Sequence, residues 1–375
     1  MLFKEVIGQE EVKKKLINSV REGRISHAQL FLGPPGSGKL PLALAYAQYI
    51  NCLNPGENDS CGVCPSCIKF AKLSHPDLHF IFPVAPVKQI SDPVSEDFLV
   101  EWRNFVLKNN AYIDLQSWLN AIGIENKQAY IRAKDCDEII KALSLTSYEA
   151  RYKIMIIWMA ERFYYSGAPK ILKILEEPPD KTLFILIAEN QEELLPTIRS
   201  RTQLVKLLRI GDDAIYNELS EKYNCPKEKA RQITFLAEGN YCSAMELFNS
   251  QEDMEELFTV FREWMLQCYY NNFIKLNAYI TNLSKLGREQ LINILTFGLK
   301  TVRNCMLIHY GMHNQVRAGG LQLESIIKLS KFINPDNIFQ FEEELNKAIF
   351  HIERNGYVKA ILLDTSLTIS QLMKK

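Results

Sequence analysis

The 375-residue sequence has no excess of either charge, because 44 lysine and arginine residues balance 44 aspartate and glutamate residues. This balance excludes a chain that is basic over its whole surface, although a local basic patch is compatible with it. No apolar run reaches the roughly 18 residues of a membrane-spanning helix, no signal peptide opens the chain, and no internal repeat or low-complexity tract is present. We therefore expect a cytoplasmic protein without membrane contact, with two or three domains at this length.

A glycine-rich loop lies between a predicted strand and a predicted helix. Residues 27–32 are apolar, residues 33–40 read GPPGSGKL, and a helix pattern follows. Glycines let backbone N–H groups turn toward phosphate oxygens at a helix N-terminus, so this order favours a phosphate loop over a chance turn. The candidate nucleotide-binding residues are Gly33, Gly36, Gly38 and Lys39.

Two oxygen-bearing positions of a working phosphate-loop site are missing. Leu40 stands where a serine or threonine would hold magnesium, and Pro41 disfavours helical geometry at Leu40, so we expect a distorted loop. The apolar strand predicted at 153–157 continues into Trp158-Met159 instead of two carboxylates. Glu161 lies two residues beyond, and we favour a solvated charge over a displaced catalytic acid. ATP and magnesium binding should be weak or absent.

Four cysteines are clustered in the sequence. Cys52, Cys61, Cys64 and Cys67 have the spacing C-x8-C-x2-C-x2-C. Four thiolates with two-residue spacers are typical of a closed structural zinc site. Disulfides or free thiols are the alternative, but disulfides are disfavoured in the cytosol. The other five cysteines are interpreted as buried small hydrophobic residues.

An arginine follows the next predicted elements. Residues 171–177 form a helix pattern ended by two prolines, residues 183–188 form another parallel-type strand, and residues 194–202 read LLPTIRSRT. Arg201, exposed by the turn, could reach the nucleotide bound by a neighbouring chain, because guanidinium binds phosphate oxygens bidentately. A surface salt bridge is the alternative.

Together these motifs resemble the AAA+ clamp-loader subunits of bacterial DNA polymerase III. The motifs that carry the resemblance are VIGQ at 6–9, the phosphate loop, the four-cysteine module, LKILEEPP at 172–179 and TIRSR at 197–201. They cover residues 1 to about 250. The resemblance is closer to delta-prime than to gamma/tau subunits, which keep Lys-Thr in the loop and Asp-Glu on the second strand.

The resemblance implies a third loss and one retained residue. Cys242 stands where the family carries a sensor arginine in its lid. Ser200-Arg201 matches the family's Ser-Arg-Cys motif, in which the arginine acts in trans on a neighbour's ATP, while Thr202 departs from the cysteine. Arg199 is the weaker alternative. The expected function is therefore a non-hydrolysing stator within the DNA-directed DNA polymerase holoenzyme; the alternative is an active gamma/tau-like ATPase that uses Lys39.

The expected architecture is an α/β AAA+ core with a parallel sheet at 1–207, a helical lid at 208–250 and an all-α collar at 251–375. The core carries the zinc module at 52–67 and an insertion at about 83–128. The implied partners are gamma/tau and delta subunits in a hetero-pentamer, primer–template DNA through the complex, and the sliding clamp indirectly.

Further local expectations concern helices and their faces. Within the insertion, Phe98, Trp102, Phe105 and Val106 share one predicted helical face, and Tyr112, Leu115, Trp118 and Leu119 suggest a second helix. We favour a packed helical pair over a partner-binding or single-stranded DNA surface. Arg132 and Lys134 open another predicted helix and are candidate DNA contacts, with a solvated helix start as the alternative. Asn334-Pro335 should begin a helix whose apolar stripe includes Ile338, Phe341, Leu345, Ile349 and Ile352.

Overall fold

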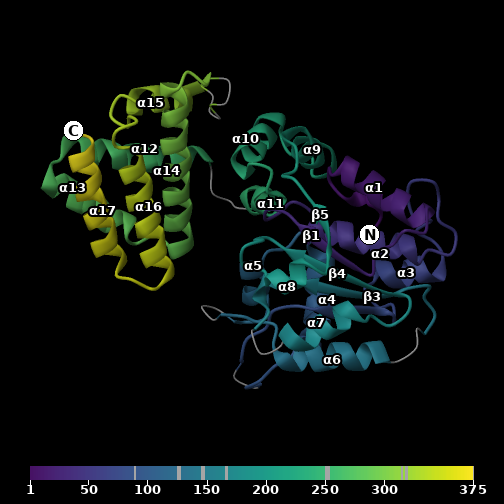
Figure 1. Cartoon of the computed structure of the whole chain (residues 1–375). Helices are drawn as coiled ribbons and strands as arrows, with labels where there is room; N and C mark the ends of the chain where they lie inside the picture. Colours follow the sequence, from purple (N-terminus) through teal and green to yellow (C-terminus); the bar gives the residue numbers. More distant parts are fainter. Residues whose placement is uncertain are drawn as a thin grey trace. The chain divides into compact units, whose positions relative to one another are not determined.

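The computed structural model describes residues 1–87, 90–124, 128–144, 148–164, 168–249, 254–313, 316 and 320–374. The chain divides into two compact units, Met1–Phe248 and Asn249–Lys375 (Figure 1). The first unit contains the sheet and the second is helical. The sequence places the corresponding boundary two residues later, at 250/251.

A five-stranded parallel sheet forms the centre of the first unit. Its strands are β1 (Ala28–Leu32), β2 (Leu78–Ile81), β3 (Lys153–Trp158), β4 (Thr182–Ala188) and β5 (Gln203–Lys206). They lie in the order β2-β3-β4-β1-β5. Every residue of β1, β3 and β4 is buried, as expected for a parallel sheet covered on both faces. The three strands predicted from the sequence are confirmed, with ends shifted by one residue.

Helices cover both faces of this sheet. One face packs against α1 (Glu10–Arg21), α2 (Lys39–Ile50), α3 (Pro65–Ala71) and the insertion, and the other against α6 (Ala133–Ser144), α7 (Ala168–Glu176) and α8 (Pro196–Arg199). Successive strand residues alternate between the two cores: Ile154 and Ile156 belong to the first, Met155 and Ile157 to the second. The expected α/β core is confirmed.

The insertion is a packed helical pair, as predicted. It contains a 3-10 turn η2 (Ser95–Phe98), α4 (Leu99–Lys108) and α5 (Leu115–Ala121). Trp102 and Trp118 are fully buried, and their ring centroids lie 5.1 Å apart in an edge-on arrangement. Buried rings are not available to stack on single-stranded DNA. The prediction for Tyr112 is wrong, because this residue precedes α5 and packs elsewhere.

Short helices complete the first unit. They are α9 (Asp212–Asn217), the π-helical turn η4 (Glu218–Lys222), α10 (Lys227–Ala237) and α11 (Tyr241–Asn249). We refer to residues 208–249 as the lid. The lid has its own hydrophobic cluster, which includes Ile215, Ile233 and Tyr241 together with Tyr112 from the insertion and Ile7 from the N-terminal segment.

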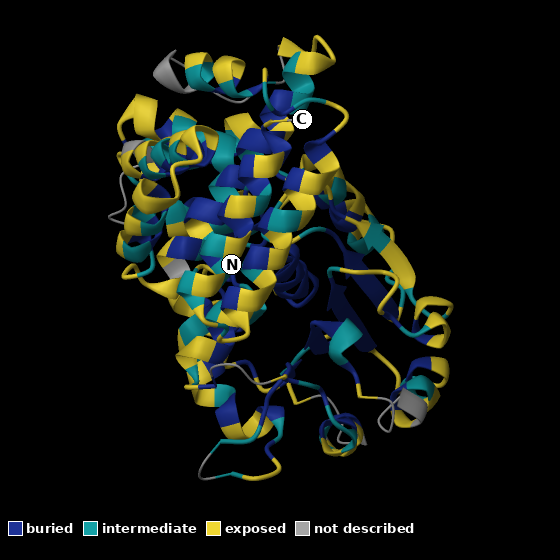
Figure 2. Cartoon of the chain, turned by 90° about the vertical axis from the view of Figure 1, so that its left-hand side faces the viewer, coloured by how far each residue is buried: buried dark blue, intermediate teal, exposed yellow. Residues whose placement is uncertain are grey.

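The second unit consists of helices with buried and exposed faces (Figure 2). They are α12 (Met254–Tyr270), α13 (Phe273–Leu283), α14 (Arg288–His309), α15 (Gly320–Leu329), α16 (Ile338–Glu353) and α17 (Val358–Leu372). On α16 the predicted stripe is confirmed at four positions, while Ala348 is buried in place of half-exposed Ile349. The predicted start at Asn334 is wrong: residues 334–337 form a turn, and Asn337 precedes the helix.

Helix α14 is the one helix within the described residues that is long and apolar enough to cross a membrane, over Gln290–His309. It is not an uninterrupted apolar run, since Lys300 and Arg303 lie within it. It packs against α12, α15 and α16, and the central helix of a helical bundle has the same length and composition.

Candidate nucleotide pocket, metal centre and exposed arginine

The phosphate loop connects the buried strand β1 to α2. Gly36 and Gly38 adopt positive φ angles of 64° and 85°, which glycine reaches without steric cost. Helix α2 begins at Lys39, so Leu40 is helical and Pro41 lies in the first turn. The expected distortion at Leu40 is therefore wrong, because a proline in the first turn lacks only an N–H that would have no partner within the helix.

Lys39 is held by its own chain. Its Nζ donates to the carbonyl oxygens of Gly33 at 2.9 Å and Pro34 at 2.7 Å, and it pairs with Glu189 Oε1 at 3.2 Å. Burial lowers the pKa of Lys39, and the nearby Glu189 carboxylate opposes this effect. The lysine side chain thus has carbonyl and carboxylate partners where a phosphate loop would offer it phosphate oxygens.

Three of the unusual residues found in the sequence meet around this loop. Leu40, Trp158 and Cys242 line one cavity of about 20 Å³, together with loop residues that include Lys39, with Glu189, and with residues 111–113 of the insertion. Met159 is buried nearby in the chain but does not line this cavity; it has a positive φ of 59°. Leu40, Trp158 and Cys242 thus come together from the loop, the end of β3 and the lid, and none of these three side chains offers a carboxylate or a guanidinium.

The expectation of a solvated Glu161 is wrong. Glu161 lies in the 3-10 turn η3 (Ala160–Arg162), where Oε1 accepts the backbone N–H of Glu189 at 2.8 Å. Its Oε2 is buried and has no hydrogen-bond partner among the described residues. Burial raises the pKa of this carboxyl. Glu161 does not line the small cavity. Its hydrogen bond to Glu189 instead fixes the backbone at the end of β4.

Sequence reasoning missed two residues of the pocket, Glu189 and Tyr112. Glu189 follows β4 directly, at the carboxyl end of the strand beside β1, which is where open parallel sheets bind ligands. That position was a usable signal. Tyr112 comes from the insertion, and nothing in its local sequence indicates that it reaches the loop.

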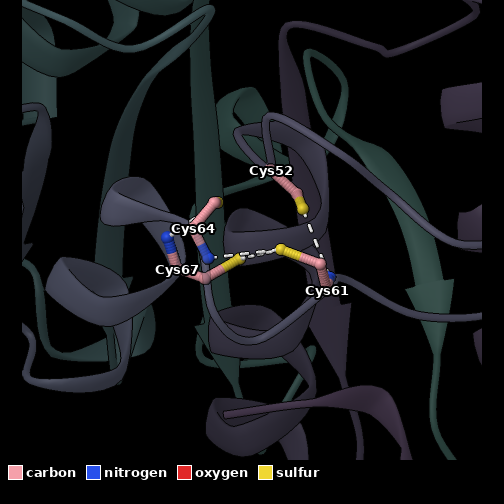
Figure 3. Close-up of side chains that lie close together, drawn as sticks. All are labelled: Cys52, Cys61, Cys64 and Cys67. Atoms are coloured by element: carbon pink, nitrogen blue, oxygen red, sulfur yellow. Dashed lines mark hydrogen bonds between the residues drawn. The ribbon is translucent and has the colours of Figure 1, made fainter.

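The four clustered cysteines converge on one point, as Figure 3 shows. Their sulfur atoms all lie within 4.8 Å of one another. Cys64 precedes α3 and caps it, Cys67 lies in its first turn, and Cys52 and Cys61 approach from the segments before it. All nine cysteines are free, so the disulfide alternative is wrong in this structure.

The geometry and chemistry of these thiols fit a bound metal such as zinc. The Sγ atoms of Cys61 and Cys67 lie 3.9 Å apart, close to the roughly 3.8 Å edge of a tetrahedron with zinc–sulfur bonds of about 2.3 Å. Backbone N–H groups of Val63 and Cys64 lower the pKa of Cys61 to about 6, whereas burial raises the pKa of Cys52 and Cys67. A cation would stabilise all four as thiolates.

Arg201 is half-exposed directly after the α8 turn. Its Nε donates to Glu176 Oε1 at 2.6 Å, and Nη1 donates to the Thr197 carbonyl at 3.0 Å and to Ser200 Oγ at 3.3 Å. The guanidinium thus forms a salt bridge with the last residue of α7. Arg201 and Ser200 do not line the phosphate-loop cavity of their own chain.

The two candidate DNA contacts have an acidic partner. Arg132 Nη1 lies 2.6 Å from Asp92 Oδ1, and Lys134 pairs with the other oxygen of the same carboxylate. The local positive charge at the start of α6 is thereby reduced. DNA contact by these residues stays a prediction.

Comparison with known proteins adds an independent observation. The family model described as DNA polymerase III, delta subunit, matches residues 8–211. The delta' subunit of Bacillus subtilis strain 168 is 30% identical over 247 residues, which are 66% of this chain and 61% of that protein. The delta' subunit of Escherichia coli K12 is 25% identical over 235 residues, 63% of this chain and 58% of that protein.

A gamma/tau relative matches over a shorter stretch. The gamma/tau subunit of Mycobacterium bovis is 32% identical over 200 residues, which are 53% of this chain and 27% of that protein. The chain therefore spans about three fifths of the two delta' relatives and about a quarter of the gamma/tau relative.

Proposed function

Because the chain belongs to the delta' family of DNA polymerase III clamp-loader subunits, we propose that it is the subunit of such a complex that does not hydrolyse ATP. In this role it supplies Arg201 to the nucleotide bound by a neighbouring gamma/tau subunit. The partners would be gamma/tau and delta subunits in a hetero-pentamer, with the helical second unit as the assembly collar. The chain would act on primer–template DNA and the sliding clamp as part of this complex, in the cytoplasm.

The observation that carries this proposal is the composition of the phosphate-loop pocket. Leu40 and Trp158 are apolar at the positions where the motif gives magnesium a hydroxyl and a carboxylate, and Cys242 offers no guanidinium to a terminal phosphate. The Glu189 carboxylate that lines the pocket is paired with Lys39. Phosphoryl transfer depends on these groups for charge stabilisation. Arg201, by contrast, lies outside the pocket and its side chain is partly exposed.

Arg201 is suited to act outside its own chain. Its backbone is fixed by the α8 turn, where the Arg201 N–H donates to the Ile198 carbonyl at 3.1 Å. Its guanidinium is held by one exposed carboxylate, that of Glu176, and exposed ion pairs are weak enough to exchange partners. A phosphate group would compete for the guanidinium through bidentate hydrogen bonds.

The test is ATP turnover by the isolated chain and by the complex reconstituted with gamma/tau and delta subunits. The isolated chain should show no magnesium-dependent turnover. Arg201→Ala should leave assembly intact and reduce turnover at the adjacent site by about a thousandfold, the effect typical of an arginine finger. Arg199→Ala is the matched comparison: this nearby exposed arginine should change turnover little.

Two outcomes would contradict the proposal. Turnover by the isolated chain that Lys39→Ala abolishes would support the alternative, an active gamma/tau-like ATPase. A larger loss from Arg199→Ala than from Arg201→Ala would assign the trans-acting role to the other arginine.

A further inference from the structure

Tyr112 leaves the insertion and enters the phosphate-loop pocket. Its side chain is buried, and its hydroxyl accepts the backbone N–H of Ile7 at 2.8 Å. Its ring lies against the loop, where a Cβ added to Gly38 would meet the Tyr112 ring and hydroxyl at 3.4 Å. One side chain from the insertion thus touches both the N-terminal segment and the loop.

Tyr112 also belongs to the hydrophobic cluster of the lid. Its ring packs edge-on against Tyr241, with centroids 4.6 Å apart, and Tyr241 is the first residue of α11. Burial raises the pKa of the Tyr112 hydroxyl, so the group is neutral throughout the physiological range. Removal of this ring would leave a cavity between the insertion and the lid.

The lid closes directly onto the loop at this place. The Tyr241 backbone N–H donates to the Gly36 carbonyl at 3.2 Å. The Asn240 side chain lies so close that a Cβ on Gly36 would fall 1.8 Å from its Oδ1. Loop backbone that could face phosphate oxygens is covered by the residues that begin α11.

The remaining volume is far too small for a nucleotide. The cavity at the loop measures about 20 Å³, which is the space of one water molecule. Pockets for small ligands measure roughly 300 Å³ or more. Glu189 in addition places a carboxylate on Lys39, the side chain that would otherwise bind phosphate. Nucleotide entry requires both the lid and the insertion to move.

We propose that the described part of the insertion, through Ala111, Tyr112 and Ile113, closes the phosphate-loop pocket against nucleoside di- and triphosphates, with Tyr112 holding the lid onto the loop. Glu189 contributes because its carboxylate pairs with the Lys39 ammonium group, which would otherwise be available to phosphate. This closure acts on binding, whereas the missing metal ligands act on hydrolysis. This inference rests on the proposed function only in taking nucleoside di- and triphosphates as the class of ligand, and it does not involve Arg201.

The fraction of molecules in which the pocket is open limits how much a variant can increase the affinity for nucleotide. If the lid and insertion separate in about 1% of molecules, the apparent dissociation constant for nucleotide is about a hundredfold above that of the open pocket. Tyr112→Ala removes the ring that joins the three segments. It should therefore raise nucleotide affinity, although it adds no contact to the ligand.

The experiment is equilibrium titration of the purified full-length chain with a fluorescent ADP analogue, without magnesium. We expect no saturable binding by the wild type and saturable binding by Tyr112→Ala, at least about tenfold tighter. Adding Lys39→Ala to that variant should abolish binding, which places the ligand on the loop. Tyr148→Ala is the control, because Tyr148 is 81% exposed and lies outside the pocket.

Equal affinity of the wild type and Tyr112→Ala would overturn the inference. If Tyr112→Ala does not fold, hydrogen exchange of the wild type with and without millimolar ADP decides: protection of residues 33–40 by ADP would show an open pocket. Either result leaves the Arg201 experiment unaffected, so failure of this inference is distinguishable from failure of the proposed function.

Discussion

At the scale of single residues, the carboxylate of Asp77 joins two distant segments of the core. It accepts the backbone N–H groups of Tyr148, Glu149 and Ala150 at 2.7, 2.9 and 2.8 Å, and it is 2% exposed. Burial by itself raises the pKa of this carboxyl, but the three hydrogen bonds and nearby His75 outweigh it and leave the pKa below its ordinary value. The ionised form is thus stabilised in the folded state.

We predict that Asp77→Ala lowers the free energy of unfolding by about 2–4 kcal/mol at pH 7, because three backbone N–H groups lose the buried carboxylate that accepts them. Since the pKa is depressed on folding, this contribution is present above about pH 4 and is lost as pH falls through the folded-state pKa. Urea denaturation at several pH values measures it. Asp180→Ala, at an exposed site, should change stability by less than about 0.5 kcal/mol. If the wild type and Asp77→Ala differed in free energy of unfolding by the same amount at every pH, the stabilising role of the ionised Asp77 carboxylate would be contradicted.

At the scale of elements, α3 shows how the cysteine cluster organises a short helix. The helix has seven residues, and isolated helices of that length are unstable in water. Its start is fixed by Cys64, whose sulfur accepts the Cys67 N–H at 3.5 Å, and by Pro65 in the first position. Phe70 anchors the other end in the core. The cluster of four cysteine side chains therefore brings the helix and the two preceding segments together.

We predict about one zinc ion per chain by elemental analysis, and loss of local structure when a chelator removes it. The melting temperature should fall by about 5 °C or more, and hydrogen exchange should increase at residues 52–71. Cys64→Ser should reproduce the effect. Cys225→Ser is the control, because this buried cysteine lies in the lid, outside the cluster. A chain that carries no metal and is insensitive to chelator would remove the zinc assignment.

At the scale of the whole molecule, the two units have separate cores. The core of Met1–Phe248 includes the sheet and the insertion, with Trp102 fully buried. The unit Asn249–Lys375 buries Leu345 of α16 and Trp264 of α12, whose Nε1 donates to Ser366 Oγ of α17 at 2.8 Å. Each unit therefore contains the packing that a cooperative folding unit needs.

We predict two thermal transitions by calorimetry. Trp102→Ala should lower the free energy of unfolding of the first unit by about 3–5 kcal/mol, and so lower the temperature of its transition. Leu345→Ala should do the same to the second unit, by about 2–5 kcal/mol. Each substitution serves as the control for the other. A single transition, or a shift of both transitions by either substitution, would show that the units unfold together.

Some features of the candidate site were predictable from the sequence and others were not. The loop glycines, Lys39 and the cysteine cluster follow local spacing rules, and Leu40 and Trp158 were assigned by counting from adjacent motifs. Glu189 was missed although its position after β4 was a usable signal. Tyr112 was assigned to a helix that it does not enter, because a helical stripe says nothing about which distant segment a side chain reaches.

Residue order alone determined the parallel sheet, the phosphate loop, the spacing of the clustered cysteines, and the apolar residues Leu40 and Trp158 at positions where the phosphate-loop motif carries metal-binding oxygens. These properties depend on neighbouring residues, whose identity and periodicity dictate local conformation. The closure of the pocket was decided only in three dimensions, where Ile7, Tyr112 and Tyr241, separated by more than a hundred positions, come into contact. Such contacts depend on how the elements pack, and packing brings together side chains that have no relation along the chain.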